Sequence, residues 1–322
     1  MTVTRRLPAM VEARLTEHYD VVLNPHDHPF TAGELRDALE AGDALLCTVT
    51  DQITAQVLST RKLRARIIAN FGVGFNHIDL DTANRRGLVV TNTPDVLTDD
   101  TADLAIALML AVARRMGEGE RELRRGAWTG WRPTHLLGTR VTGKTLGIVG
   151  FGRIGQAVAR RAFHGLRMRI VAAGRRPPPE AVATELEVDW LPLDDLLGRA
   201  DFVSLHAPAA ADTHHLIDAR RLRLMRSDAF LINTARGNIV DEAALIDALD
   251  AGVIAGAGLD VYEHEPKIHS ALLRCPRMVL LPHLGSATIE SRTAMGMKAV
   301  DNLDAFFEGR EPADEVGRVR ST

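Results

Sequence analysis

"GIVGFGRIGQAVARRA", residues 147–162, decides the fold of this 322-residue chain. A short apolar segment precedes Gly150, Gly152 and Gly155, and a helical pattern follows them. The first glycine permits a tight turn, the second lets a backbone approach a pyrophosphate, and the third allows close packing of helix against strand. The N-terminus of the helix would then face the phosphates. This order of strand, glycine turn and helix predicts a dinucleotide-binding βαβ unit.

The second strand of that unit, residues 169–174, ends in Gly174, Arg175 and Arg176, within "VAAGRRPPPE" (171–180). An Asp or Glu about 20 residues past the glycine motif would bind the ribose hydroxyls of NAD. No acid stands here. A 2′-phosphate would be repelled by a carboxylate and attracted by guanidinium groups. We therefore expect NADP as the preferred cofactor, with NAD as the alternative if the two arginines are simply solvated in a stiff proline turn.

The rest of the chain alternates short apolar runs with polar helical stretches, which is a βαβ pattern. Near-continuous apolar strands are typical of parallel sheets that are buried on both faces, and right-handed crossovers make such sheets doubly wound. We expect an α/β fold with two doubly wound parallel sheets. The expected strands lie within residues 44–50, 66–74, 87–94, 144–152, 169–174, 201–208, 229–237, 255–262 and 278–285.

Two long helical segments suggest how the chain divides into domains. Residues 97–115 begin with a capping pattern and are apolar at helical spacing, and residues 290–309 form a second such segment after the last strand. We expect a substrate-binding, flavodoxin-like domain made of residues 1–97 and 288–322. A dinucleotide-binding Rossmann domain, residues 98–287, would be inserted into it.

Composition excludes several classes of protein. Hydrophobic residues make up 46% and charged residues 25%, as in a globular protein, and the formal charge is -3. This charge balance gives no indication of a surface that binds nucleic acid or a membrane. The first 15 residues lack a continuous apolar segment, and the most apolar run, residues 102–113, is too short to cross a bilayer. We expect a cytoplasmic protein without nucleic-acid or membrane partners.

Neither the cysteines nor the histidine pairs have the spacing of a metal site. Cys47 and Cys275 stand alone, which also argues against a disulfide framework and fits a reducing compartment. The pairs His26/His28 and His214/His215 have no third ligand nearby in sequence. We expect both pairs in surface loops and no bound metal.

Three polar residues follow expected strands near the C-terminal half: Arg236 in "INTARGNIVDE", Glu265 in "VYEHEP" and His283 in "LPHLGSAT". Carboxyl ends of parallel strands line the ligand crevice of a doubly wound sheet, so these side chains could converge. Hydride transfer to a 2-keto acid needs a guanidinium for the carboxylate and an acid for the new alkoxide. Histidine titrates near neutrality, and a paired carboxylate would fix its ring. Singly, each residue has an ordinary structural alternative.

Five motifs together resemble the D-isomer-specific 2-hydroxyacid dehydrogenases, in the family's order and across nearly the whole chain. They are "NFGVGFNHIDLDTANRRGLVVTNTP" (70–94), "GFGRIGQAVARRA" (150–162), "INTARGNIVDEAAL" (232–245), "AGAGLDVYEHEP" (255–266) and "PHLGSAT" (282–288). The resemblance implies that Arg236 binds substrate, that His283 is the catalytic histidine, and that Glu265 orients it. It also implies that the backbone of Val73 and Gly74 holds the substrate carboxylate.

The glycine turn and the resemblance together define the expected cofactor contacts. They are Thr101, Gly150, Gly152, Arg153, Ile154, Gly155, Gly174, Arg175, Arg176, His206, Pro208, Thr213, Thr234, Ala235, Arg236, Asp260, His283 and Gly285.

Within the family, "DVLTDDTADLAIALMLAVARR" (95–115), "GAWTGWRP" (126–133) and the acid-free "GRRPPPE" look most like the glyoxylate/hydroxypyruvate reductase branch. That branch is dimeric, and the resemblance implies that Trp131 reaches into the active site of the partner subunit. Simple interface or core packing is the alternative for Trp128 and Trp131. The segment 266–282 lacks the family's usual Asn-His-Pro-Leu motif and is slightly short. We therefore expect the loop beside the active site to differ from that of the family.

The resulting prediction is NADPH-dependent reduction of small 2-keto acids, glyoxylate and hydroxypyruvate first, to D-2-hydroxy acids, with His283 as the general acid. Two alternatives stay open. One is a 2-ketogluconate-type sugar-acid reductase with the same chemistry and a roomier pocket. The other is a dinucleotide-sensing interaction protein similar to the corepressors of the family.

Overall fold

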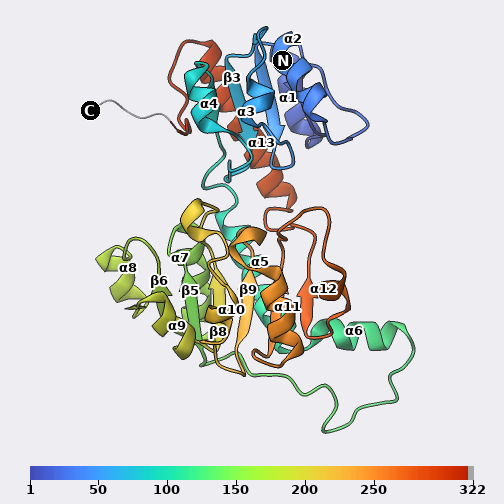
Figure 1. Cartoon of the computed structure of the whole chain (residues 1–322), viewed down its shortest axis with the longest axis vertical. Helices are drawn as coiled ribbons and strands as arrows, with labels where there is room; N and C mark the ends of the chain where they lie inside the picture. The colour runs from blue at the N-terminus through green and yellow to red at the C-terminus, as the bar shows by residue number, and fades with distance from the viewer. Residues whose placement is uncertain (318–322) are drawn as a thin grey trace. The chain divides into compact units, whose positions relative to one another are not determined.

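The chain folds into two compact units (Figure 1). In this computed structural model the first unit comprises Met1–Leu97 and Ala287–Thr322, and the second comprises Thr98–Ser286. Residues 1–317 are described. Each unit is built on its own parallel sheet, so the expected α/β fold with two parallel-sheet domains is confirmed.

The sheet of the first unit has the spatial order β1-β2-β3-β4, and every pairing in it is parallel. Its strands are Thr2–Val3, Ala44–Thr48, Ile67–Phe71 and Val89–Thr91. Thr2 of β1 also forms an isolated parallel bridge with Val22, which lies outside the named strands. The second extended segment of the chain therefore lies on the far side of the first, which is the strand order of flavodoxin-like sheets.

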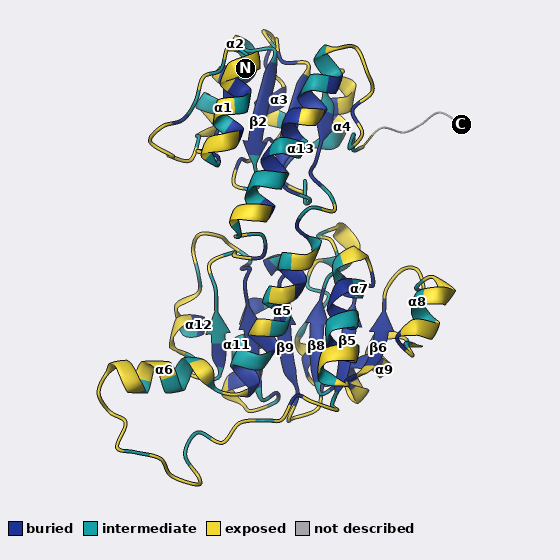
Figure 2. Cartoon of the chain, turned by 180° about the vertical axis from the view of Figure 1, so that it is seen from behind, coloured by how far each residue is buried: buried dark blue, intermediate teal, exposed yellow. Residues whose placement is uncertain are grey.

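Helices cover both faces of this sheet (Figures 1 and 2). α13 (Ile289–Phe307) contacts β3 and α1 (Ala9–His18), so the C-terminal helix belongs to the same unit as the N-terminal one. α2 (Ala32–Ala41), α3 (Ala55–Leu58) and α4 (Leu80–Arg85) lie in the other layer and bury apolar side chains against β2, β3 and β4. Each of these three begins at a side chain that accepts from the first turn, as expected for good N-caps.

The sheet of the second unit has the order β11-β10-β9-β8-β5-β6-β7, again with parallel pairings throughout. Its strands, from β5 to β11, are Thr145–Val149, Arg169–Ala173, Asp189–Trp190, Phe202–Leu205, Phe230–Asn233, Gly256–Leu259 and Met278–Leu280. The order reverses between β5 and β8. At such a switch point the loops beyond the carboxyl ends diverge and leave room for a ligand, which is the geometry of a Rossmann domain.

Two helical layers enclose this second sheet. α5 (Thr98–Ala113) packs on α7 (Arg153–Arg160) and crosses β9, β10 and β11, while α9 (Leu193–Arg199) contacts β5 and β6 on the other side. The remaining helices are α6 (Met116–Arg124), α8 (Glu180–Glu185), α10 (Ala219–Leu222), α11 (Glu242–Asp250) and α12 (Ser270–Arg274). α7 continues as a π-helical turn over Arg161–Gly165, and Gly237–Ile239 forms a 3-10 turn. Within residues 1–317, no helix has the length and apolar character needed to cross a membrane.

Candidate active site

The glycine turn after β5 has the shape that a bound pyrophosphate requires. Gly150 adopts φ +93°, and a Cβ there would lie 2.6 Å from the backbone nitrogen of Ala207. Gly152 is the N-cap of α7, supplies no side-chain cap, and would place a Cβ in open space. Gly152 therefore leaves the first N–H groups of α7 without a side-chain cap, and a phosphate can bind there.

Two exposed arginine side chains follow the end of β6. Gly174, Arg175 and Arg176 are all exposed. Within residues 1–317, neither arginine side chain has a hydrogen-bond or ion-pair partner. A Cβ on Gly174 would lie 3.2 Å from the Trp190 ring, so the position tolerates little bulk. The turn after β6 therefore presents two exposed arginines, and Gly174 stands where an NAD-binding acid would be.

Arg236 lies in a tight turn directly after β9. The side-chain amide of Asn233 organises that turn: its nitrogen donates to the Arg236 carbonyl at 2.9 Å and its oxygen accepts from the Ala235 N–H at 3.0 Å. Burial lowers the pKa of Arg236, opposed by the negative charge of Glu265, but an arginine remains charged at any physiological pH. The guanidinium is thus a permanent, partly desolvated cation.

Glu265 and His283 form a hydrogen-bonded pair. His283 Nδ1 lies 2.8 Å from one carboxylate oxygen of Glu265, and the Tyr262 N–H donates to the other at 3.0 Å. Burial by itself would raise the pKa of Glu265, but the hydrogen bond and the charge of His283 outweigh it, and the pKa is lowered. The carboxylate stays ionised, and with Nδ1 engaged the Nε2 atom of the ring is left for a reacting partner.

Asp260 holds the loop that carries His283. The His283 N–H donates to the Asp260 carbonyl at 2.9 Å, and the Asp260 carboxylate accepts from the N–H groups of Leu284 (2.6 Å) and Gly285 (2.8 Å). Thr101 adds a hydroxyl donor to the Gly285 carbonyl at 2.9 Å. Asp260 is fully buried, and this burial raises its pKa despite the two hydrogen bonds. His283 itself has φ +57°, a conformation that these bonds maintain.

Other expected cofactor residues stand at the carboxyl ends of the central strands. His206 follows β8, bonds Ser204 Oγ at 2.8 Å, and is kept neutral because burial lowers its pKa to about 4. The Thr213 hydroxyl donates to the Pro208 carbonyl at 2.7 Å. The Thr234 hydroxyl is buried without a partner among residues 1–317, which is a polar atom that a ligand could satisfy. Together with the glycine turn, these groups fit a dinucleotide.

Val73 and Gly74 lie in the first unit, in the turn after β3. The Asn70 side chain donates to the carbonyls of Gly72 and Gly74 at 3.0 Å, and Asn92 donates to that of Val73 at 2.8 Å. In the described part of the chain, the N–H groups of Val73 and Gly74 have no acceptor. Two successive N–H groups without an acceptor are available to an anion such as a carboxylate.

The structure brings Arg236, Glu265 and His283 to the ends of three neighbouring strands, β9, β10 and β11. It also reveals supporting residues that sequence reasoning missed: Asn233, Tyr262 and the second function of Asp260 as a loop anchor. A buried polar residue as the last member of an apolar strand was the available signal for Asn233. Trp131 lies outside this set, in the segment after α6, with 83% of its surface exposed.

Comparison with known proteins identifies the class. Residues 106–285 match the family model described as "D-isomer specific 2-hydroxyacid dehydrogenase, NAD binding domain". The chain belongs to the D-isomer-specific 2-hydroxyacid dehydrogenases, a family of oxidoreductases whose nucleotide-binding domain is the second unit here.

Within that family, the chain is 44% identical to the glyoxylate reductase of Thermococcus onnurineus, over 98% of this chain and 95% of the relative. An NADPH-dependent glyoxylate/hydroxypyruvate reductase from Sinorhizobium meliloti, solved with NADP and malonate, superposes with a TM-score of 0.86 at 36% identity, covering 100% of this chain and 98% of the other. A protein from Thermus thermophilus has a TM-score of 0.90 at 45% identity, over 98% and 99% of the two chains. These similarities support reduction of 2-keto acids.

Proposed function

We propose that this protein reduces small 2-keto acids, glyoxylate and hydroxypyruvate first, to D-2-hydroxy acids with NADPH. The observation that carries the proposal is the His283–Glu265 pair beside a partly desolvated Arg236 on neighbouring strands. This arrangement supplies a proton donor and a fixed cation at the edge of the sheet where a nucleotide-binding turn also lies. Reduction of a keto group needs these elements and no metal.

Each side chain has a defined role in this reaction. The reduced nicotinamide, when bound, supplies the hydride that adds to the keto carbon. Arg236 binds the substrate carboxylate and polarises the carbonyl, which stabilises the developing negative charge on oxygen. His283 gives its Nε2 proton to that oxygen, and Glu265 orients the ring and stabilises the imidazolium before transfer. The Val73 and Gly74 N–H groups bind the substrate carboxylate.

NADP as the preferred cofactor rests on the end of β6. No carboxylate stands at Gly174, and the two unpartnered arginines beside it can bind a 2′-phosphate. The Sinorhizobium meliloti relative is described as NADPH-dependent and was solved with NADP. We expect the reaction to run toward reduction in the cytoplasm, where NADPH is kept reduced.

A homodimer completes the proposal. Trp128 is 51% exposed and Trp131 83% exposed, and Leu137 nearby is 66% exposed. Large apolar side chains gathered on one exposed segment are typical of an interface. We propose that this segment meets a second copy of the chain and that Trp131 contacts substrate in the partner's active site.

The test is steady-state turnover of glyoxylate, hydroxypyruvate, pyruvate and 2-ketogluconate, each with NADPH and with NADH. We expect the highest kcat/KM for the first two acids with NADPH. An Arg236→Ala variant should be inactive, since it loses both the carboxylate contact and the polarising charge. Full activity of a His283→Ala variant with hydroxypyruvate would refute the proposed acid.

The same measurements separate the alternatives. Preference for 2-ketogluconate would indicate a sugar-acid reductase with the same residues in the same roles. Saturable NADPH binding without turnover of any of the four acids would favour a dinucleotide-sensing interaction protein.

A further inference from the structure

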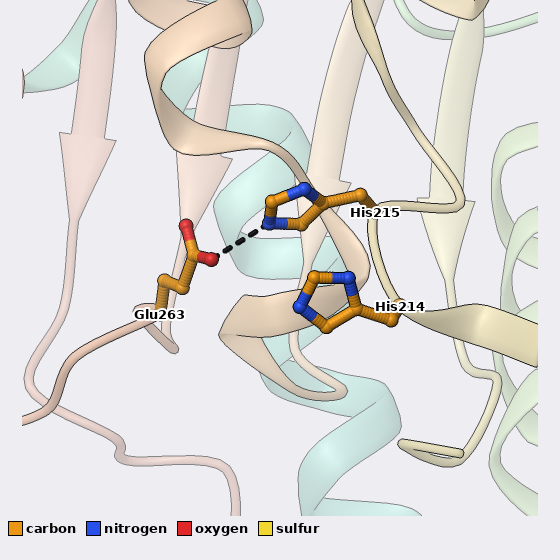
Figure 3. A group of neighbouring side chains, drawn as sticks. All are labelled: His214, His215 and Glu263. Carbon is orange, nitrogen blue, oxygen red and sulfur yellow. Dashed lines mark hydrogen bonds and ion pairs between the residues drawn. The ribbon is translucent and has the colours of Figure 1, made fainter. Parts of the chain in front are cut away.

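Two consecutive histidines are stacked face to face in the loop after β8. Consecutive side chains of an extended chain point in opposite directions. His215, however, has φ +47°. With this left-handed residue in the loop, the imidazole rings of His214 and His215 lie on one side of the chain, with centroids 4.0 Å apart and planes inclined by 29° (Figure 3). Four ring nitrogens are thereby concentrated at one place on the second unit.

A carboxylate from a distant loop completes the group. Glu263, which follows β10 and is 48 residues further along the chain, places Oε1 at 2.7 Å from His215 Nε2. The three side chains, called the histidine cluster below, offer ligand atoms that all lie within 4.8 Å of one another. Donor atoms around a tetrahedral zinc ion are about 3.4 Å apart. His214 is exposed, so rotation of its ring can shorten the longer separations.

The second nitrogen of His215 also has the neighbour expected at a metal site. His215 Nδ1 lies 4.0 Å from Oδ2 of Asp241, whose Oδ1 accepts from the Ala244 N–H at 3.0 Å and is thereby anchored to α11. Histidine ligands generally present their other ring nitrogen to a carboxylate or carbonyl, which fixes the tautomer and strengthens the donor. At 4.0 Å Asp241 is beyond hydrogen-bond distance of Nδ1, and a small movement of either side chain would bring it into this role.

We propose that the histidine cluster binds one zinc ion through His214, His215 and Glu263, with water completing the coordination. Two imidazole nitrogens and one carboxylate favour a borderline cation such as zinc, whereas magnesium and calcium require oxygen ligands. The sequence prediction of no metal here rested on the absence of a third ligand nearby in sequence. Folding supplies that ligand from another loop.

The position of the cluster gives the ion a structural effect. The His215 N–H donates to the Asn238 carbonyl at 2.8 Å, two residues beyond Arg236, and Glu263 is two residues before Glu265. A shared ion would cross-link the loop after β8 to the loop after β10. Because an unfolded chain would not hold these ligands together, zinc should raise the melting temperature of the protein.

Zinc titration of the purified full-length protein, in competition with a chromophoric chelator, tests the proposal. We expect one equivalent of zinc per chain, at least tenfold weaker binding in His214→Ala and in His215→Ala, and weaker binding in Glu263→Gln. His28→Ala is the matched control, since His28 is also an exposed histidine, paired with Glu34 at 3.0 Å. It should bind zinc as the unmodified protein does.

Two further readouts distinguish ligation from a general loss of structure. Cobalt in place of zinc should give a visible absorption band that disappears in His214→Ala, while circular dichroism and zinc-free turnover of this variant stay unchanged. Magnesium should not compete. Unaltered zinc affinity in a His214→Ala/His215→Ala double variant, or no uptake by the unmodified protein at micromolar zinc, would overturn the proposal.

Discussion

Glu265 is held ionised by its partner, and this coupling predicts what its loss does to catalysis. The interaction that lowers the Glu265 pKa stabilises the pair of a carboxylate and a protonated His283. Glu265→Gln removes the negative charge, so the protonated ring becomes less favourable. Reduction needs that proton, and the variant also loses the hydrogen bond that orients the ring, so kcat/KM for hydroxypyruvate should fall. Turnover at neutral pH should drop about a hundredfold.

The control for this variant lies two residues away. Glu263→Gln makes the same chemical change on the same loop, but Glu263 pairs with His215 instead of His283. Its kcat/KM for hydroxypyruvate reduction should match that of the unmodified protein when no zinc is present. Equal losses of kcat/KM in the two variants would mean that general loop electrostatics, and not the Glu265–His283 pair, support the reaction.

Cofactor choice is a second property of individual residues. Replacing Gly174 with Asp and neutralising Arg175 and Arg176 should shift preference toward NADH by about 1 to 3 kcal/mol, the scale of charge-assisted hydrogen bonds. Any Cβ at Gly174 is tight against Trp190, at 3.2 Å. Gly174→Ala is therefore the control that separates crowding from charge. We would abandon the interpretation of the arginines as selectors if the ratio of kcat/KM values for the two cofactors stayed unchanged.

At the same scale, the limits of sequence reasoning have a common cause. Arg236, Glu265 and His283 could be proposed because each follows an apolar run and strand ends meet at one edge of a sheet. The roles of Asn233 and Tyr262 depend on hydrogen bonds inside turns, which no periodicity encodes. Glu263 could not be joined to His214 and His215 because their approach depends on how two loops fold.

At the scale of elements, the glycine turn and α7 make a matched experiment. A Cβ at Gly155 would lie 2.3 Å from the Gly150 carbonyl oxygen, whereas one at Gly152 would meet nothing within 4 Å. Gly155→Ala should force α7 away from the turn and cost about 1 to 3 kcal/mol of unfolding free energy. Gly152→Ala should leave stability unchanged but weaken NADPH binding, because the methyl group occupies the approach to the phosphates.

Thermal denaturation and fluorescence titration with NADPH measure both effects. If Gly152→Ala bound NADPH as tightly as the unmodified protein, the pyrophosphate would have to lie elsewhere. A fully stable Gly155→Ala variant would show that α7 can move without penalty, contrary to the close approach described.

All nine expected strands exist, and each is shorter than the apolar run that predicted it. Residues 66–74, for example, contain a strand only over Ile67–Phe71, because the chain then turns through Gly72 and Gly74. Two strands were missed, β1 and β7, each of two residues. Such short strands have no periodicity to detect and form because a neighbouring strand offers hydrogen-bonding groups. The π-helical turn after α7 was missed because five residues have too little periodicity to distinguish it from the helix before it.

At the scale of the whole molecule, Trp131 tests the homodimer. Trp131→Ala should lower kcat/KM for hydroxypyruvate about ten- to a hundredfold by removing a large apolar contact. Trp128→Ala, nearby on the same exposed segment, should change it little. Light scattering measures the mass of each variant and should give two chains per particle.

Mixing variants shows which subunit the tryptophan serves. A particle that combines one Trp131→Ala chain with one His283→Ala chain contains one site with both residues intact if Trp131 acts on the partner. In an equimolar mixture, exchange makes about half of the particles mixed, each with one intact site of two, so activity should rise toward about a quarter of that of the unmodified protein. No recovery in exchanged mixtures would mean that Trp131 acts within its own chain or not at all.

The three proposed catalytic side chains and the glycine turn all belong to Thr98–Ser286, while Val73 and Gly74, the proposed carboxylate-binding residues, belong to the other unit. The chain passes between the units at only two places, after Leu97 and after Ser286. One unit can therefore be exchanged for that of a relative by joining the chains at these two junctions. We expect that grafting the first unit of a relative with another substrate range at these two junctions would change which acids are accepted. The chimaera should keep the proton transfer and the cofactor preference of the unmodified protein.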